Sequence, residues 1–164
     1  MITFVEATTK DIPLLQQLAR EIWYAHYPSI ISLQQIEYML ELMYATDIID
    51  REMSEGYQWR IILYGEQPVG FLSFHFEQPL QKVKLNKLYL IPAWHNKGIG
   101  QQALQFVIDQ ARKLNAKAVF LTVNKKNEKA IAAYLKAGFF IDHSEKFDIG
   151  QGFFMDDYVM QFNL

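Results

Sequence analysis

The sequence contains no cysteine among its 164 residues, which excludes disulfides, thiolate catalysis and zinc sites built on cysteine. The four histidines show no paired ligand spacing, so we expect no metal centre. No uncharged run is long enough to cross a bilayer, and Glu and Lys stand near the start, where a signal peptide needs an apolar stretch. These absences predict a cytoplasmic protein that does not act at a membrane.

The sequence also lacks a large excess of charge of either sign, since the formal net charge is −2. Nucleic-acid binders normally carry a strongly basic surface, so we expect no nucleic-acid partner. The charge is nevertheless uneven along the chain. Residues 82–136 hold eleven Lys or Arg and two acidic residues, a net charge of +9, and the remaining residues carry −11. The basic segment either suits an anionic ligand or forms ordinary solvated helix surfaces, and both interpretations stay open.

The content of hydrophobic residues, 51%, is high enough for a substantial core, and no linker interrupts the chain, so we expect residues 1–164 to form one domain. Apolar spacing predicts one helix that begins at a cap at Thr9 and a second that follows a capping box at Ser32 and Gln35. Three more helices are expected over residues 47–55, 98–115 and 127–137. Strands are expected over residues 59–64, 69–76, 82–91, 118–123, 139–146 and 155–162. The strand, helix and strand around residues 85–123 imply a parallel pair in an otherwise antiparallel sheet, hence a mixed α/β (α+β) fold.

The segment Gly98-Ile99-Gly100 carries the strongest functional signal. It follows a strand and opens a helix, where backbone N–H groups without helical partners meet the positive end of the helix dipole. Glycines let an anion approach these groups, and Lys97 adds positive charge. The alternative is a tight turn that only allows close packing. A dinucleotide fold is disfavoured because the next strand ends without a carboxylate, and a P-loop because Gln101 follows the last glycine.

Two motifs resemble those of the GCN5-related N-acetyltransferase (GNAT) family. His95-Asn96-Lys97-Gly98-Ile99-Gly100 is similar to the Q/R-x-x-G-x-G/A signature for acetyl-coenzyme A, and residues 124–139 are similar to the second motif, N-x-x-A-x-x-x-Y-x-x-x-G-F. The resemblance is close over residues 85–139, whereas residues 1–58 match only in being mainly helical. Position 95 departs from the signature because it is His instead of Gln or Arg.

The resemblance implies the GNAT fold, in which the parallel strand pair splays apart and the pantetheine arm lies in the gap. It implies acetyl-coenzyme A as co-substrate. The residues it assigns to coenzyme binding are Leu88, Tyr89, Leu90, His95, Asn96, Lys97, Gly98, Ile99, Gly100, Gln101 and Asn127. Lys125, Lys126 and Lys129 stand where they can meet phosphate groups.

The resemblance also implies direct acetyl transfer with Tyr134 as the catalytic proton donor to the departing thiolate. An amine must lose a proton before it attacks the thioester, and the group that accepts this proton stays open between His75, Glu77 and an ordered water molecule. Without the motif, a tyrosine at helical spacing such as Tyr134 would be read as a core residue.

The second motif is closest to the polyamine-acetylating branch, so we expect a small cationic amine as acceptor. Candidate carboxylates for attracting it are Glu21, Glu37, Glu41, Asp47, Asp156 and Asp157, and candidate aromatic residues are Trp23, Tyr24, Tyr27, Tyr38, Tyr44 and Trp59, which also suit a core. The alternatives are a protein N-terminus or lysine as acceptor, and a non-catalytic module that binds coenzyme A. The sequence leaves open whether the protein is a homodimer.

Overall fold

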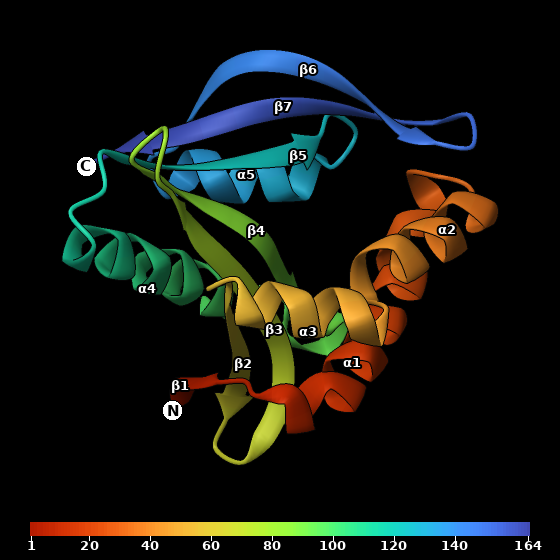
Figure 1. Ribbon diagram of the computed structural model, residues 1–164, viewed down its shortest axis with the longest axis horizontal. Coiled ribbons are helices and arrows are strands. Elements are labelled where there is room, and N and C mark those ends of the chain that lie inside the picture. The colour runs from red at the N-terminus through yellow and green to blue at the C-terminus, as the bar shows by residue number, and fades with distance from the viewer. The chain divides into compact units, whose positions relative to one another are not determined.

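A computed structural model describes residues 1–164 and contains seven strands and five α-helices (Figure 1). The strands are β1 (Ile2–Glu6), β2 (Gln58–Tyr64), β3 (Gln67–Glu77), β4 (Lys82–Leu90), β5 (Ala118–Asn124), β6 (Phe140–Gly150) and β7 (Phe153–Asn163). The helices are α1 (Ile12–His26), α2 (Leu33–Tyr44), α3 (Thr46–Ser54), α4 (Ile99–Lys113) and α5 (Glu128–Lys136). The strand order is β1-β2-β3-β4-β5-β7-β6, and β4 and β5 are parallel, which confirms the mixed α/β fold.

The chain divides into two compact units. The first unit is Met1–His75 with Lys87–Ala103, and the second is Phe76–Asn86 with Leu104–Leu164. Strands β3 and β4 and helix α4 therefore contribute residues to both units.

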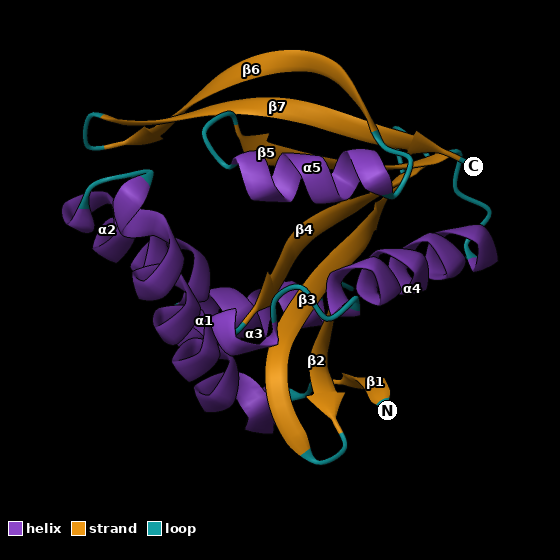
Figure 2. Cartoon of the chain, turned by 180° about the vertical axis from the view of Figure 1, so that it is seen from behind, coloured by secondary structure: helices purple, strands orange, loops and turns teal.

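In the first unit, α1, α2 and α3 pack on one another beside the antiparallel strands β1, β2 and β3 (Figure 2). The apolar spacing of α1 predicts its buried face, and Leu15, Leu18 and Ile22 are indeed buried. Trp59 on β2 and Phe71 on β3 stack with ring centroids 6.1 Å apart and form the aromatic part of this core.

In the second unit, β7 lies between β5 and β6 and pairs antiparallel with both. The parallel register joins Val83 to Val119 and Lys84 to Phe120, although β5 continues to Asn124. The expected parallel pair is therefore paired only over its first residues, as a splayed pair requires.

The sequence-based element boundaries agree with the structure within a few residues, with two exceptions. Strand β1, which pairs with β2 at the edge of the sheet, was not predicted. The predicted cap at Thr9 is wrong, because Thr8 and Asp11 form a capping box around a short 3-10 turn and α1 begins at Ile12. None of the helices combines the length and apolar character needed to cross a membrane.

Candidate functional site

The loop between β4 and α4 is held in a sharply bent conformation. Asn96 and Gly98 have left-handed backbones, with φ of 61° and 80°. Glycine and asparagine adopt this region most readily, which explains their places in the loop. The His95 Nε2 donates a hydrogen bond of 3.0 Å to the carbonyl of Leu90. This histidine, which stands where the signature has Gln or Arg, therefore fastens the loop to the end of β4.

The start of α4 offers backbone donors beside open space. The first helical bond runs from the Gln102 N–H to the Gly98 carbonyl, so the N–H groups of Ile99 and Gly100 precede the bonded part of the helix. Ile99 is only 3% exposed and anchors the turn. A Cβ built on Gly98 or Gly100 would meet no atom within 4 Å, so the glycines are not required by internal packing. This cradle fits a phosphate group.

A hollow of about 220 Å³ borders this loop within the first unit. Its lining includes the exposed Lys97 together with Tyr64 and Trp94, whose rings lie 4.9 Å apart. Lys97 therefore adds a positive charge at the edge of an open, partly aromatic surface.

The end of β4 lies against β3 on one side. Gly70 is necessary there, because a Cβ at this position would come within 2.2 Å of the Tyr89 carbonyl oxygen. The ring of Tyr89 packs 5.8 Å from Trp23 and 5.7 Å from Phe71, and its hydroxyl is 3.3 Å from that of Tyr27. The first unit thus brings Leu88, Tyr89 and Leu90 together with the loop of His95 to Gln101.

The second unit contains the other two predicted site residues, Asn127 and Tyr134. Asn127 is buried and caps α5 by accepting a hydrogen bond of 3.4 Å from the Ala130 N–H. Tyr134 is half-buried on α5, with its ring 6.0 Å from that of Phe139. Figure 2 shows the short loop that leads from β5 into this helix. The capping role of Asn127 adds to the coenzyme contact predicted for it.

Of the predicted proton acceptors, His75 stacks on Tyr57 with ring centroids 4.0 Å apart and an interplanar angle of 18°. Glu77 is the last residue of β3 and is half-buried. No group of three or more His, Asp or Glu side chains is arranged to hold a metal ion.

The structure separates the candidate acceptor-site aromatic residues into two groups. Trp23, Tyr27, Tyr44 and Trp59 are at most 9% exposed, so they belong to the core of the first unit. Tyr24 and Tyr38 are half-buried, and the Tyr24 hydroxyl donates to the Glu37 carboxylate.

The candidate carboxylates also differ in their partners. Glu37 and Glu41 lie one turn apart on α2, where their like charges repel each other. Glu37 pairs with Arg20 at 3.0 Å, and the positive charge of Arg20 offsets this repulsion. Asp156 pairs with Lys125 at 3.1 Å. Asp157 is 2% exposed, and its Oδ1 has no hydrogen-bond partner. Burial, and secondarily the charge of Asp156, raises the pKa of Asp157 to about 6.

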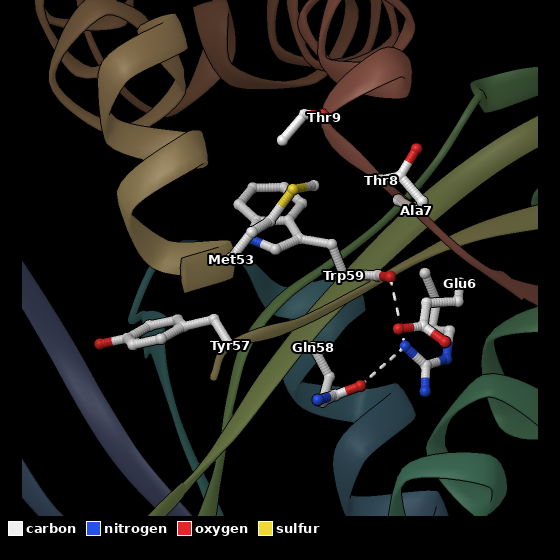
Figure 3. A pocket seen from close by; sticks show the side chains of 9 residues that line it. Glu6, Ala7, Thr8, Thr9, Met53, Tyr57, Gln58 and Trp59 are labelled. Atoms are coloured by element: carbon white, nitrogen blue, oxygen red, sulfur yellow. Dashed lines mark hydrogen bonds between the residues drawn. The ribbon is translucent and has the colours of Figure 1, made fainter. Parts of the chain in front are cut away.

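Another hollow, of about 280 Å³, lies in the first unit between the start of β2 and the end of α3 (Figure 3). Met53, Tyr57 and Trp59 line its apolar side. Arg60 Nη1 donates to the Gln58 side chain at 3.0 Å and to the Trp59 carbonyl at 3.4 Å. None of the residues predicted to bind coenzyme A lines this hollow.

Comparison with known proteins connects this geometry to a family. The model of the acetyltransferase (GNAT) family matches residues 15–139. A protein of Mycobacterium bovis named an uncharacterized N-acetyltransferase is 38% identical over 78 residues, which are 48% of this chain and 49% of that protein. The chain thus spans about half the length of the curated relatives it matches.

Solved structures share the fold over nearly the whole chain. The PaiA N-acetyltransferase from Thermoplasma acidophilum, in complex with coenzyme A, has a TM-score of 0.84 and 23% identity, covering 100% of this chain and 99% of that one. A chimera of the spermidine N-acetyltransferase SpeG from Vibrio cholerae and hSSAT has a TM-score of 0.72 and 17% identity, covering 99% of this chain and 95% of that one.

Proposed function

Because the chain belongs to the acetyltransferase (GNAT) family, we propose that it transfers the acetyl group of acetyl-coenzyme A to a primary amine by direct attack. The observation that carries this proposal is the loop before α4, where Gly98 and Gly100 leave space beside backbone donors at a positive helix end. The PaiA neighbour, which was crystallised with coenzyme A, supports the choice of ligand.

The residues of the loop have separate tasks in this reaction. The N–H groups at the start of α4 bind the pyrophosphate, and Lys97 supplies a screened positive charge at the rim. His95 holds the loop to Leu90 and keeps the donors in place. The backbone of Leu88, Tyr89 and Leu90 bonds the pantetheine arm in the manner of an added strand.

Tyr134 acts when the bond between the acetyl carbon and sulfur breaks. Its hydroxyl donates a proton to the departing thiolate, which makes the thiolate a better leaving group. Asn127 keeps the start of α5 in place through its cap and contributes its side chain to coenzyme binding.

We assign a small cationic amine, such as a polyamine, as the acceptor. The net charge of residues 1–58 is −6, with three basic and nine acidic residues, which favours a cationic substrate over an anionic one. The spermidine acetyltransferase among the structures that share the fold supports this class without identifying the amine.

A screen of amines tests the proposal. The full chain is incubated with acetyl-coenzyme A and, in separate reactions, spermidine, butylamine, a lysine-containing peptide and a peptide with a free N-terminus. Free-thiol release is followed, and mass spectrometry confirms the acetylated product. We expect release with spermidine above the rate without amine. Release with a peptide alone would change the acceptor class, and coenzyme binding without release in any reaction would contradict the proposed activity.

A further inference from the structure

Asp157 on β7 is a buried carboxyl group that the reaction described above does not use. The residue is 2% exposed, and no donor reaches its Oδ1. Buried polar groups in folded proteins almost always have a partner, and a buried charge without one is costly. The stability of the fold therefore does not explain why a carboxyl group is buried at position 157.

The nearest cations of the second unit do not meet this need. Lys125 Nζ bonds Asp156 at 3.1 Å and lies 5.4 Å from the centre of the Tyr158 ring, so it is held by the neighbouring residues. Lys84 attracts Asp157 only at longer range. On β6, Glu145 stands opposite Asp157 and bonds His143 at 3.2 Å. No hydrogen bond or ion pair to a cation of the second unit therefore satisfies the Oδ1 of Asp157.

The strand register places Asp157 at one end of the sheet. It pairs with Asn124, the last residue of β5, beyond the stretch where β4 and β5 are in register. The Asn124 side chain accepts a hydrogen bond of 2.9 Å from the Lys126 N–H in the turn that leads to α5. Asp157 thus lies at the end of β5 from which the helix carrying Tyr134 begins.

We propose that Asp157 binds an ammonium group of the acceptor other than the amine that is acetylated. This inference rests on the proposed function and identifies the group that selects its substrate. An ammonium group supplies the missing donor and the missing positive charge together, and charge-assisted hydrogen bonds are stronger than neutral ones. A primary ammonium on an unbranched alkyl chain is also slim enough to reach a recessed carboxylate. Asp156, Lys125 and Lys84 set the local field in which it binds.

The test compares Asp157→Asn with Asp142→Asn, which removes the same charge from an exposed residue of β6. We expect Asp157→Asn to raise the KM for spermidine about 10 to 100-fold, as for a lost hydrogen bond to a charged group, with the Kd for acetyl-coenzyme A unchanged. Asp142→Asn should match the wild type. A purely structural role would alter stability but leave the KM for spermidine unchanged, and that outcome would overturn the inference.

A second measurement separates this inference from the proposed activity. Carboxyl carbon NMR of the wild type with spermidine should show the pKa of Asp157 falling below its value without the amine, because a bound cation favours the ionised form. If this shift occurs and no amine is acetylated, the binding role stands and the activity fails. If acetylation proceeds and spermidine leaves the Asp157 signal unchanged at saturation, the inference fails and the activity stands.

Discussion

The ring of Tyr134 packs against Phe139 with centroids 6.0 Å apart, so Tyr134→Phe keeps this contact and loses only the hydroxyl. We expect kcat to fall roughly 10 to 1000-fold, because a positioned proton donor is removed, and the Kd for acetyl-coenzyme A to change little. Stopped assays of thiol release and equilibrium binding measure the two quantities. Tyr44→Phe is the control, since the Tyr44 hydroxyl is buried in the core without a partner. Equal kcat values for Tyr134→Phe and wild type would make Tyr134 a packing residue.

The raised pKa of Asp157 also predicts how the free energy of unfolding changes with pH. Its pKa is about 6 in the folded chain and near 3.8 when unfolded, so the folded state holds more protons between these values. The free energy of unfolding therefore falls as pH rises from about 4 to above 6. The loss should be roughly 1 to 3 kcal/mol, where the lower value allows for screening by water.

Urea unfolding at several pH values checks this prediction. Asp157→Asn has no proton to lose, so it should be more stable than wild type at pH 7.5 and close to wild type at pH 4. A variant that is more stable but binds spermidine more weakly would show the opposition between stability and function that is common at binding sites. If Asp157→Asn were less stable at pH 7.5, the carboxylate would have a stabilising partner, which would contradict the isolation of its Oδ1.

At the scale of the elements, Lys87 and Glu52 join β4 to α3 inside the first unit. Lys87 Nζ is 4.0 Å from Glu52 Oε1 and lies 5.0 Å from the centre of the Trp59 ring. The two side chains are only 10% and 18% exposed. Burial raises the pKa of Glu52, and the charge of Lys87 opposes this rise.

Removing one partner should therefore cost more than removing both. We expect Lys87→Met to lower the free energy of unfolding by roughly 3 kcal/mol, because Glu52 is left buried and unpaired. The double variant Lys87→Met with Glu52→Leu should recover most of this loss, as replacing a buried ion pair with apolar residues often does. Denaturant unfolding of both variants provides the measurement. A double variant less stable than the single one would mean that each side chain stabilises the fold independently.

A substitution at the start of α4 tests whether this loop binds the coenzyme. Gly100→Val should weaken acetyl-coenzyme A binding at least about 10-fold with the fold retained, because the new side chain occupies the open space beside the donors and not the packed core. Calorimetric titration gives the Kd, and circular dichroism checks the fold. Gln105→Val introduces the same side chain at an exposed position of the same helix and should leave the Kd unchanged. An unaltered Kd in Gly100→Val would remove this loop from the binding site.

The elements show which features could be predicted from the sequence. The helices and most strands follow from apolar periodicity, and the loop before α4 follows from its glycines, because both signals lie within a few consecutive residues. Strand β1 could not be predicted, since its five residues are stabilised by pairing with β2, more than fifty residues later. The contact between His95 and Leu90 depends on how the loop folds back on β4.

The burial of Asp157 without a hydrogen-bond partner for its Oδ1 was harder to predict from the sequence than the helices or the loop before α4. Asp156 and Asp157 are adjacent, and the sequence suggested either of them as a carboxylate near the acceptor. Only the strand geometry decides that Asp156 bonds Lys125 while Asp157 is buried. Alternation along β7 places the two side chains on opposite faces, but the sequence alone does not tell which face is covered.

At the scale of the whole molecule, positive and negative charges are concentrated in different parts of the chain. The basic segment of residues 82–136 contains the loop before α4 and α5, whereas residues 1–58 carry −6. One part of the chain therefore suits an anionic coenzyme and the other a cationic acceptor. Such fields guide charged ligands but are screened over about 8 Å at physiological salt, so their effect must depend on ionic strength.

Salt should accordingly alter the choice between amines. We expect the ratio of kcat/KM for spermidine to that for butylamine to fall as salt rises from about 50 to 500 mM, because the amine with more charges loses more attraction. The KM for acetyl-coenzyme A is followed in the same buffers to separate screening at the coenzyme site. Glu41→Lys, which reverses an exposed charge on α2, should lower the ratio at low salt and make it less dependent on salt. A ratio that stays constant over this range, or a preference for an uncharged acceptor, would mean that contacts within the site and not the charge of residues 1–58 select the amine.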